Sequence, residues 1–255
     1  MSTHPVSTHA IGIDIGGTGI KGAIVDLAAG ELVTERFKVP TPEGGKPDDI
    51  VAAVVKMIDG MGKAADGLAV GICFPAVVIH GRTMSAANVS KKWIGLEAEK
   101  LFEKSLKRDI TFVNDADAAG VAEVRYGAAK GKKGLVILTT LGTGIGSAII
   151  FDEVLVPNSE LGHLEVDGND AESRAAYSAK ERDGLDWEQW TKRLQRYYDV
   201  VDALFSPDLI VVGGGVSKNA DQFLPLLKLR PEILPAALRN NAGIMGAASM
   251  ATPSR

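Results

Sequence analysis

The sequence has little of several features that mark whole classes of protein. Cys73 is its only cysteine, which excludes an internal disulfide and any zinc site built from several cysteines. Aromatic residues make up only 5% of the chain, and no run of 18 apolar residues could form a membrane-spanning helix. The first ten residues contain no apolar segment typical of a secretion signal. These absences lead us to expect a cytoplasmic protein.

An excess of charge of one sign is also lacking. The 28 basic and 32 acidic residues give a net charge of −4, so no overall field attracts nucleic acid or an anionic membrane. We therefore expect neither as a partner, and any polyanion must be held by local groups. With 255 residues, of which 45% are hydrophobic, the chain can bury one large core or two modest ones.

The order of β-rich and helical segments repeats once along the chain. Apolar and β-branched runs predict three strands, then a helix and a further strand, and a second series of this kind begins near residue 134. The predicted strands are 10–16, 22–29, 31–39, 67–75, 109–115, 133–141, 147–156 and 208–215, and the predicted helices are 48–61, 96–106, 116–129, 187–205, 218–228 and 241–251.

This repeat predicts an α/β protein of two similar domains with a cleft between them. The N-terminal domain is expected to span residues 1–114 and the C-terminal domain residues 115–235. A final helix near 236–255 is expected to pack back on the first domain.

Gly17, Gly19 and Gly22 form a G-x-G-x-x-G pattern directly after the first predicted strand. In a dinucleotide site a helix follows such glycines, and the pyrophosphate lies at its N-terminus. Here the following segment, IKGAIVDL, is short and contains several β-branched residues, which predicts a strand. The glycines are therefore expected to form a hairpin turn, and the dinucleotide interpretation fails. The Walker pattern of a P-loop is absent as well.

The composition of this turn suits phosphate. Gly16 and Gly17 allow backbone N–H groups to approach phosphate oxygens, Thr18 adds a hydroxyl donor, and Lys21 adds a positive charge. Asp14 would repel phosphate unless a metal ion lay between them. Its position therefore predicts Mg²⁺, held through water.

A second glycine-rich turn, LGTGIGS, lies at the matching place in the second series. It contains Gly142, Thr143 and Gly144, with Thr140 shortly before them. One such turn is explained by hairpin geometry, since tight hairpins favour glycine. Two of them, each with a threonine, predict a pair of phosphate-binding loops that face each other across the cleft, as phosphoryl transfer requires.

Five segments in this order resemble the ROK family of sugar kinases, which belongs to the actin-like, hexokinase-like ATPases. They are DIGGTGIK (14–21), FVNDADAAG (112–120), TTLGTGIGSA (139–148), ELGH (160–163) and LIVVGGGVS (209–217). The resemblance extends over about residues 10–250 and is strongest to the polyphosphate-using branch of the family.

The resemblance implies two actin-like (ribonuclease H-like) domains of the hexokinase/ASKHA type. It also implies a kinase that phosphorylates the 6-hydroxyl of glucose, and of mannose, with inorganic polyphosphate, ATP or both as donor and Mg²⁺ as cofactor. A glucokinase that uses ATP alone is the alternative within the family. Relatives are commonly homodimers.

One part of the family pattern is missing. Most members carry a zinc site made of a histidine and a C-x-C-G-x-x-G-C cluster after the ELGH-type segment. No cysteine follows His163 here, so zinc is not expected. The polyphosphate-using branch resembles this sequence in that absence.

The resemblance assigns roles to individual residues. Asp115 matches the catalytic base, although its place directly before a predicted helix would suit an N-cap equally well. The residues expected to bind the sugar are Asn88, Asn114, Asp115, Glu160, His163 and Glu172. The donor is expected to contact both glycine-rich turns together with Gly214 and Gly215, for which a plain strand-to-helix turn is the structural alternative.

Two other classes of protein are less well supported. A sugar-sensing regulator of this family carries an N-terminal winged helix-turn-helix, and the first predicted strand leaves no room for one. A sugar-binding module without catalysis would need neither Asp115 nor two phosphate turns.

A further hypothesis concerns Lys130, Lys132 and Lys133, which precede the strand leading to the second turn and could contact polyphosphate. Their joint replacement is then expected to weaken polyphosphate use more than ATP use.

Overall fold

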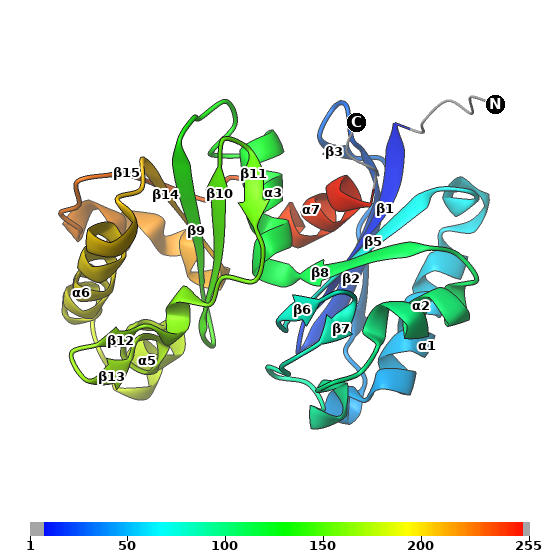
Figure 1. Ribbon diagram of the computed structural model, residues 1–255, viewed down its shortest axis with the longest axis horizontal. Coiled ribbons are helices and arrows are strands. Elements are labelled where there is room, and N and C mark those ends of the chain that lie inside the picture. The colour runs from blue at the N-terminus through cyan, green and yellow to red at the C-terminus, as the bar shows by residue number, and fades with distance from the viewer. Residues whose placement is uncertain (1–7, 252–255) are drawn as a thin grey trace. The chain divides into compact units, whose positions relative to one another are not determined.

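The computed structural model describes residues 8–251, which form β-sheets and helices (Figure 1). The contacts of the chain gather in two units. The first unit contains the described residues up to Ala119 together with those from Gly243 onward, and the second contains Gly120–Ala242. The chain therefore passes from one unit to the other after Ala119 and after Ala242. The expected domain limits, residues 114 and 235, lie a few residues before these two positions.

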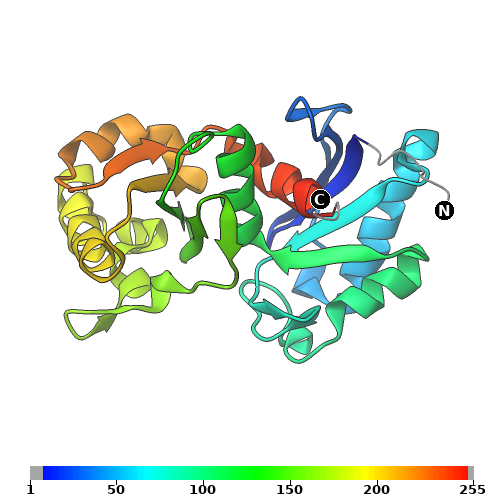
Figure 2. The same ribbon diagram turned by 45° about the horizontal axis from the view of Figure 1, so that its top comes forward.

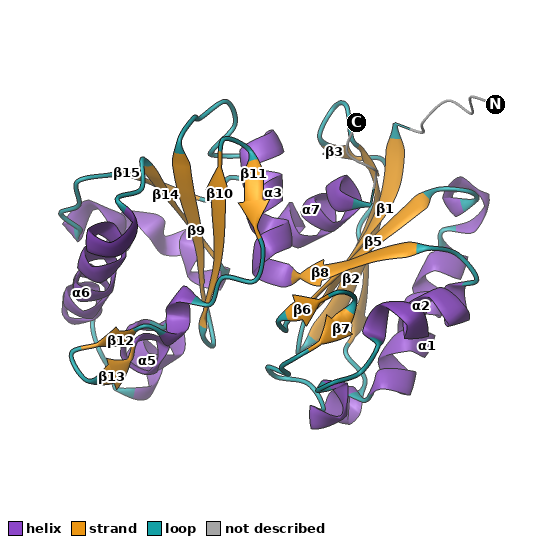
Figure 3. Cartoon of the chain, viewed as in Figure 1, coloured by secondary structure: helices purple, strands orange, loops and turns teal. Residues whose placement is uncertain are grey.

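The first unit is built on a six-stranded sheet in the order β3-β2-β1-β5-β8, with β4 also paired to β2. β1 and β2 are antiparallel, whereas β1, β5 and β8 run parallel (Figure 3). Its elements are β1 (His9–Ile15), β2 (Gly19–Asp26), β3 (Glu31–Leu32), β4 (Phe37–Pro40), α1 (Pro47–Gly60), β5 (Ala69–Phe74), the hairpin β6 (Val78–Ile79) and β7 (Arg82–Thr83), α2 (Ala98–Leu106), β8 (Ile110–Asn114), the first residues of α3 (Asp115–Tyr126), and α7 (Ala242–Met250).

Apolar periodicity explains how α1 covers one face of this sheet. Ile50, Val54 and Met57 recur every three or four residues and are buried, so they form one stripe along the helix. Asp48 and Asp49 lie in its first turn, where negative charge interacts favourably with the helix dipole. The buried stripe belongs to the same apolar core as the isoleucines of β1.

α7 lies against the strands β1 and β5 at two glycines (Figure 2). A Cβ atom at Gly12 would come within 1.9 Å of the carbonyl oxygen of Ile244, and one at Gly71 would come equally close to that of Ala247. The backbone of α7 can approach the sheet this closely only because these positions carry no side chain. The C-terminal helix is therefore an integral part of the first unit.

The second unit repeats this plan. Its five-stranded sheet has the order β11-β10-β9-β14-β15, with β9 and β10 antiparallel and β9, β14 and β15 parallel. Its elements are β9 (Leu135–Leu141), β10 (Ile145–Phe151), β11 (Val154–Val156), the hairpin β12 (Glu165–Val166) and β13 (Asn169–Asp170), α4 (Ala171–Ala175), α5 (Tyr177–Arg182), α6 (Trp187–Phe205), β14 (Leu209–Gly213) and β15 (Glu232–Pro235).

α6 supplies most of the aromatic core of this unit. Trp190, Leu194, Tyr198 and Val201 are completely buried and recur at helical spacing. The helix begins with a capping box, in which the side chain of Asp186 accepts from the third helical residue and that residue's side chain bonds back to the Asp186 backbone. Sequence therefore determines both the start and the buried face of α6.

The α/β class and the two similar halves are confirmed, since each sheet has an antiparallel hairpin followed by two parallel strands. Short helices are found around 218–228 as expected, but they are of the 3₁₀ type. Two 3₁₀ helices, Gly215–Gln222 and Leu224–Leu226, occupy that stretch. Pro225 lacks an N–H group and disfavours helical geometry at the residue before it, so a continuous α-helix does not form. The strand β15 was not predicted.

Among the described residues, no helix is both long and apolar enough to cross a membrane.

Candidate active site

The predicted site residues fall in both units. The first unit holds Asp14, Gly16, Gly17, Thr18, Lys21, Asn88, Asn114 and Asp115. The second unit holds Thr140, Gly142, Thr143, Gly144, Glu160, His163, Glu172, Gly214 and Gly215.

The first glycine-rich turn joins β1 to β2, as the strand prediction for the residues after it requires. The N–H of Gly16 donates to the carbonyl of Gly19 at 3.0 Å, and the hydroxyl of Thr41 donates to the Gly16 carbonyl at 2.5 Å. A Cβ atom at Gly17 would lie 2.7 Å from the Cβ of Asn88. The fold therefore packs the predicted phosphate turn directly against the asparagine expected to bind sugar.

Two carboxylates lie at one edge of the first sheet. Strand register pairs Asp14 with both Lys21 and Cys73, and Asp115 follows the neighbouring parallel strand β8. Lys21 Nζ donates to Asp14 Oδ2 at 3.0 Å. Burial raises the pKa of the Cys73 thiol well above its usual range, and the negative charges of Asp14 and Asp115 raise it further. Cys73 is thus a neutral buried thiol near two carboxylates.

Asn114 caps helix α3. Its Oδ1 accepts from the backbone N–H groups of Ala116 and Asp117 at 2.8 and 3.0 Å, and its Nδ2 donates to the carbonyl of Ala76 at 3.0 Å. Asn114 therefore makes the capping contacts with two N–H groups, and Oδ1 of Asp115 shares one of them, the N–H of Ala116, at 2.8 Å. Asp115 itself is half-buried at the start of the helix.

Replacement of the cap should be measurable. We expect Asn114→Ala to lower the free energy of unfolding by about 1–2 kcal/mol, because it removes two capping bonds and the bond to Ala76. Asn114→Asp keeps a capping oxygen and should lose less. Chemical denaturation of both variants checks this, and equal losses would contradict a capping role.

The second glycine-rich turn joins β9 to β10 and is held by side chains of the helical segment that follows. Glu172 Oε2 accepts from the N–H of Ile145 at 3.0 Å, and a Cβ atom at Gly144 would lie 2.4 Å from that oxygen. The hydroxyl of Ser178 donates to the carbonyl of Thr143 at 2.6 Å. Glu172, which the family resemblance assigned to the sugar, therefore also fixes the predicted phosphate turn.

The three glycines at the end of β14, Gly213, Gly214 and Gly215, differ in what surrounds them. Gly214 has a positive φ of 82°, and a Cβ atom there would come within 2.4 Å of the carbonyl oxygen of Leu141. The close approach of β9 therefore requires Gly214, as the structural alternative for this motif proposed. Around Gly215 a Cβ atom would meet nothing within 4 Å. Gly213 pairs with Thr140 across the two parallel strands.

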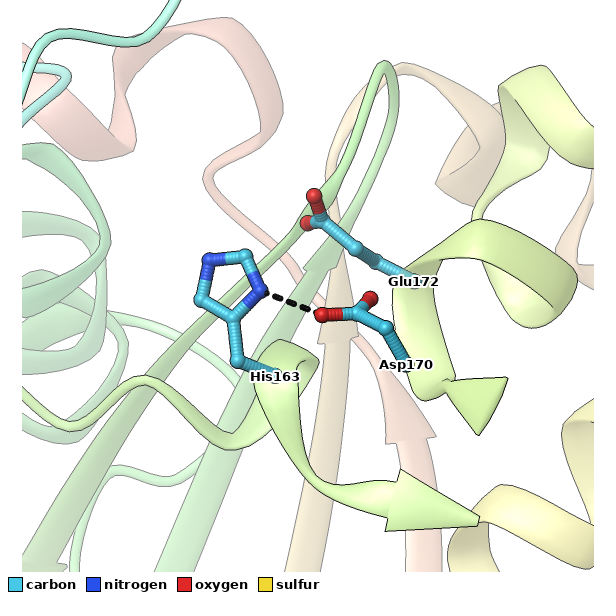
Figure 4. A group of neighbouring side chains, drawn as sticks. All are labelled: His163, Asp170 and Glu172. Atoms are coloured by element: carbon cyan, nitrogen blue, oxygen red, sulfur yellow. Dashed lines mark hydrogen bonds and ion pairs between the residues drawn. The ribbon is translucent and has the colours of Figure 1, made fainter. Parts of the chain in front are cut away.

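His163 and three carboxylates form a cluster in the second unit. His163 Nδ1 lies 2.9 Å from Asp170 Oδ2, and Glu172 lies beside both (Figure 4). Burial raises the pKa of Glu160. The charge of His163 lowers this pKa, and the charge of Glu172 raises it. The hydrogen bond to Asp170 raises the pKa of His163, and the charges of Glu172, Asp170 and Glu160 act in the same direction. The imidazolium form therefore persists to higher pH than in an isolated histidine, and the stabilisation it supplies is lost as pH rises through the raised pKa.

Two residues of this region were missed from sequence. Asp170 precedes a short helix, which indicates a cap and nothing about a histidine seven residues earlier. Only the turn between β12 and β13 brings the two side chains together. Ser178 has no sequence signal at all, since its contact with the second turn depends on how α5 packs.

Comparison with known proteins shows the family of this chain. A model described as the ROK family matches residues 10–178, well over half of the chain. The chain belongs to the ROK family. The polyphosphate glucokinase of Mycobacterium tuberculosis is 46% identical over 241 residues, which cover 94% of this chain and 90% of that protein.

Two solved structures of the ROK sugar kinases are similar to this one. The inorganic polyphosphate/ATP-glucomannokinase of Arthrobacter sp. strain KM is 53% identical, with a TM-score of 0.90 and coverage of 96% of this chain and 98% of the other. A ROK family glucokinase of Streptomyces griseus, in complex with glucose and AMPPNP, is 25% identical, with a TM-score of 0.81 over 95% and 98% of the chains.

Two places in this ROK protein carry side chains that could bind a metal ion. Asp14 offers a hard carboxylate oxygen at the rim of the first turn, which is the ligand type that Mg²⁺ prefers. In the second unit, ligand atoms of His163, Asp170 and Glu172 lie within 4.8 Å of one another. There Nδ1 of His163 bonds to Asp170, and Oε2 of Glu172 accepts from the N–H of Ile145.

The lysines near residue 130 are largely paired with acids. Lys132 Nζ lies 2.5 Å from a carboxylate oxygen of Glu232, and Lys133 Nζ lies 2.9 Å from one of Glu153. Lys130 has no ion pair with a described residue. If this segment contacts polyphosphate, Lys130 is therefore the residue best able to do so.

Proposed function

We propose that this chain is a hexose kinase that transfers a phosphoryl group from inorganic polyphosphate or ATP to the 6-hydroxyl of glucose. The observation that carries the proposal is its 53% identity, over nearly the whole of both chains, to a polyphosphate/ATP-glucomannokinase. A regulatory role is not favoured, because the first unit retains a carboxylate at the end of β8 and both units retain a glycine-rich hairpin turn.

We infer that Asp115 is the general base. Phosphoryl transfer needs little covalent help from the protein, which must place the attacking hydroxyl and accept its proton. Asp115 is half-buried at the carboxyl end of β8, and the neighbouring Asn114 accepts from the N–H groups of both Ala116 and Asp117. It is therefore suited to accept the proton of the 6-hydroxyl as that oxygen attacks the terminal phosphorus.

The first turn is proposed to hold the donor phosphates. Gly17 and Thr18 are exposed at its tip, where backbone N–H groups and a hydroxyl can donate to phosphate oxygens. Lys21 would then exchange its contact with Asp14 for one with the donor. Asp14, with one carboxylate group, suits Mg²⁺ held through water, and the ion would neutralise charge on the phosphates.

The second turn is proposed to bind the donor in the same manner, through Gly142, Thr143 and Gly144. For the sugar we propose contacts from Asn88 and Asn114 in the first unit and from Glu160, His163 and Glu172 in the second. Since Oε2 of Glu172 is engaged by the Ile145 N–H, its sugar contact would use Oε1.

The direct test is formation of hexose 6-phosphate by the purified protein with Mg²⁺. Polyphosphate and ATP are compared as donors, and glucose and mannose as acceptors, with a sample lacking Mg²⁺ as control. We expect activity with both donors and both sugars. Activity with ATP alone would replace this proposal by an ATP-dependent glucokinase, and absence of hexose phosphate with every pair would refute it.

We also propose that the protein is a homodimer and lies in the cytoplasm. Sedimentation of the same sample tests the homodimer, and cell fractionation tests the cytoplasmic location.

A single lysine allows the polyphosphate hypothesis to be tested. We expect Lys130→Ala to lower kcat/KM for polyphosphate by about threefold or more while leaving that for ATP nearly unchanged, because a longer polyanion reaches more cations. Lys133→Ala, which removes a cation already paired with Glu153, is the control. Equal loss with both donors would contradict the hypothesis.

A further inference from the structure

His163 is held by a side chain to which the family resemblance gives no role. The turn between β12 and β13 reverses the chain, so that Asp170 returns to His163 and its Oδ2 lies 2.9 Å from the ring Nδ1 (Figure 4). The other oxygen, Oδ1, accepts from the N–H of Ser173 at 3.4 Å and caps α4. One carboxylate thus joins the imidazole to the start of a helix.

We propose that Asp170 is a positioning residue for the sugar, acting through His163. Its carboxylate fixes the orientation of the ring and keeps the proton on Nδ1, so that Nε2 faces away from Asp170 and is available to a sugar hydroxyl. This inference rests on the proposed function, in which His163 contacts the sugar.

The chemistry of imidazole explains why such a partner matters. In a neutral ring one nitrogen donates and the other accepts, and the partner of Nδ1 decides which form is present. A carboxylate can only accept, so it selects the form with a proton on Nδ1. The same logic applies where a buried aspartate orients the histidine of a hydrolytic triad, and there an asparagine in place of the aspartate favours the wrong tautomer.

The exposure of both side chains indicates that the contact between His163 and Asp170 serves ligand binding more than folding stability. The side chains of His163 and Asp170 are 57% and 44% exposed, and ion pairs at such positions contribute little to folding. Glu160 and Glu172 face the same ring and also favour its charged form. The hydrogen bond to Asp170 is the largest of these influences on the pKa of His163. Loss of Asp170 should therefore change sugar affinity while the unit stays folded.

The experiment compares two substitutions that both retain the cap of α4. Asp170→Ser keeps a capping oxygen but is too short to reach His163, and Asp170→Asn keeps the length but can donate to Nδ1. We expect KM for glucose to rise about tenfold in both, by analogy with the roughly 10–100-fold losses that follow when the carboxylate orienting a metal-bound histidine is removed. KM for the donor should stay within about twofold. Asp167→Asn, on the same hairpin and paired with Arg196, is the control and should leave KM for glucose unchanged.

A double variant separates positioning from a structural role. If Asp170 acts through His163, then Asp170→Asn should cause no further rise in KM for glucose once His163→Ala is present. Independent, additive effects would overturn the proposal. So would an unchanged KM for glucose in both single variants.

A readout without catalysis keeps this test distinct from that of the proposed function. The chain has four histidines, so the imidazole signals can be followed individually by NMR. We expect the pKa of His163 to fall in Asp170→Asn, and the shift of its signal on adding glucose to weaken. An unchanged His163 titration would overturn the inference even in an active kinase. A wild-type protein whose His163 signal ignores glucose and that forms no hexose phosphate would instead refute the proposed function.

Discussion

Asp115→Asn should lower kcat by roughly 10²–10⁴-fold, the usual contribution of a positioned general base. An amide has nearly the shape of the carboxylate but does not accept the proton of the attacking hydroxyl. Binding of glucose should be retained, because the amide oxygen still accepts a hydrogen bond. The measurements are steady-state kinetics with each donor and glucose affinity by calorimetry.

Asp109→Asn is the matched control for this variant. Asp109 is exposed just before the start of β8, whereas Asp115 follows its end, so the same change of charge occurs away from the predicted site. We expect its kcat to match the wild type. Near-normal turnover in Asp115→Asn would falsify the assignment of the base, and equal loss in both variants would indicate a general effect of charge.

Gly12→Ala should cause a large loss of stability in the first unit. The new Cβ atom would lie 1.9 Å from the carbonyl oxygen of Ile244 and 2.8 Å from its carbonyl carbon. These are backbone atoms of α7, so relief requires that the helix move away from β1. Overpacking of this kind costs about 1–3 kcal/mol and occasionally more.

The control for this substitution is Gly60→Ala, at the end of α1. There the nearest atom to the new methyl group is 3.9 Å away, an ordinary contact. Thermal unfolding of both variants checks the expectation, with a clear fall in Tm only for Gly12→Ala. If both variants unfold at the wild-type temperature, α7 does not pack on β1 as closely as the structure indicates. Gly243 packs against Asp14 at the start of the same helix, so Gly12→Ala should lower activity as well.

Local patterns in the sequence were sufficient for the strands β1, β2, β9 and β10 and for the helix α6. Their apolar spacing, β-branched residues and capping signals act over a few residues, and the structure agrees with them. For the same reason the β-branched residues after the first glycine-rich turn were enough to exclude a dinucleotide site. The short helices expected around 218–228 are 3₁₀ helices, since Pro225 lacks an N–H group and interrupts the helical hydrogen bonds.

Contacts between distant parts of the chain could not be read from the sequence. Asn114 and Asp115 are neighbours with similar capping propensity, and only the packing of β8 and α3 shows that Asn114 accepts from the N–H groups of Ala116 and Asp117 while Asp115 shares that of Ala116. The glycine at 214 proved to be required by the backbone of β9, a partner more than 70 residues earlier.

The sequence by itself determined the α/β class, the two glycine-rich hairpins and membership of a sugar-kinase family, because these depend on local periodicity and on short motifs. The tertiary structure alone decided which groups meet: Gly17 with Asn88, Glu172 with the second turn, and Asp170 with His163. Each of these contacts depends on where a turn or helix places a side chain relative to residues elsewhere in the chain. Such placement is set by packing of the whole unit, which no short stretch of sequence encodes.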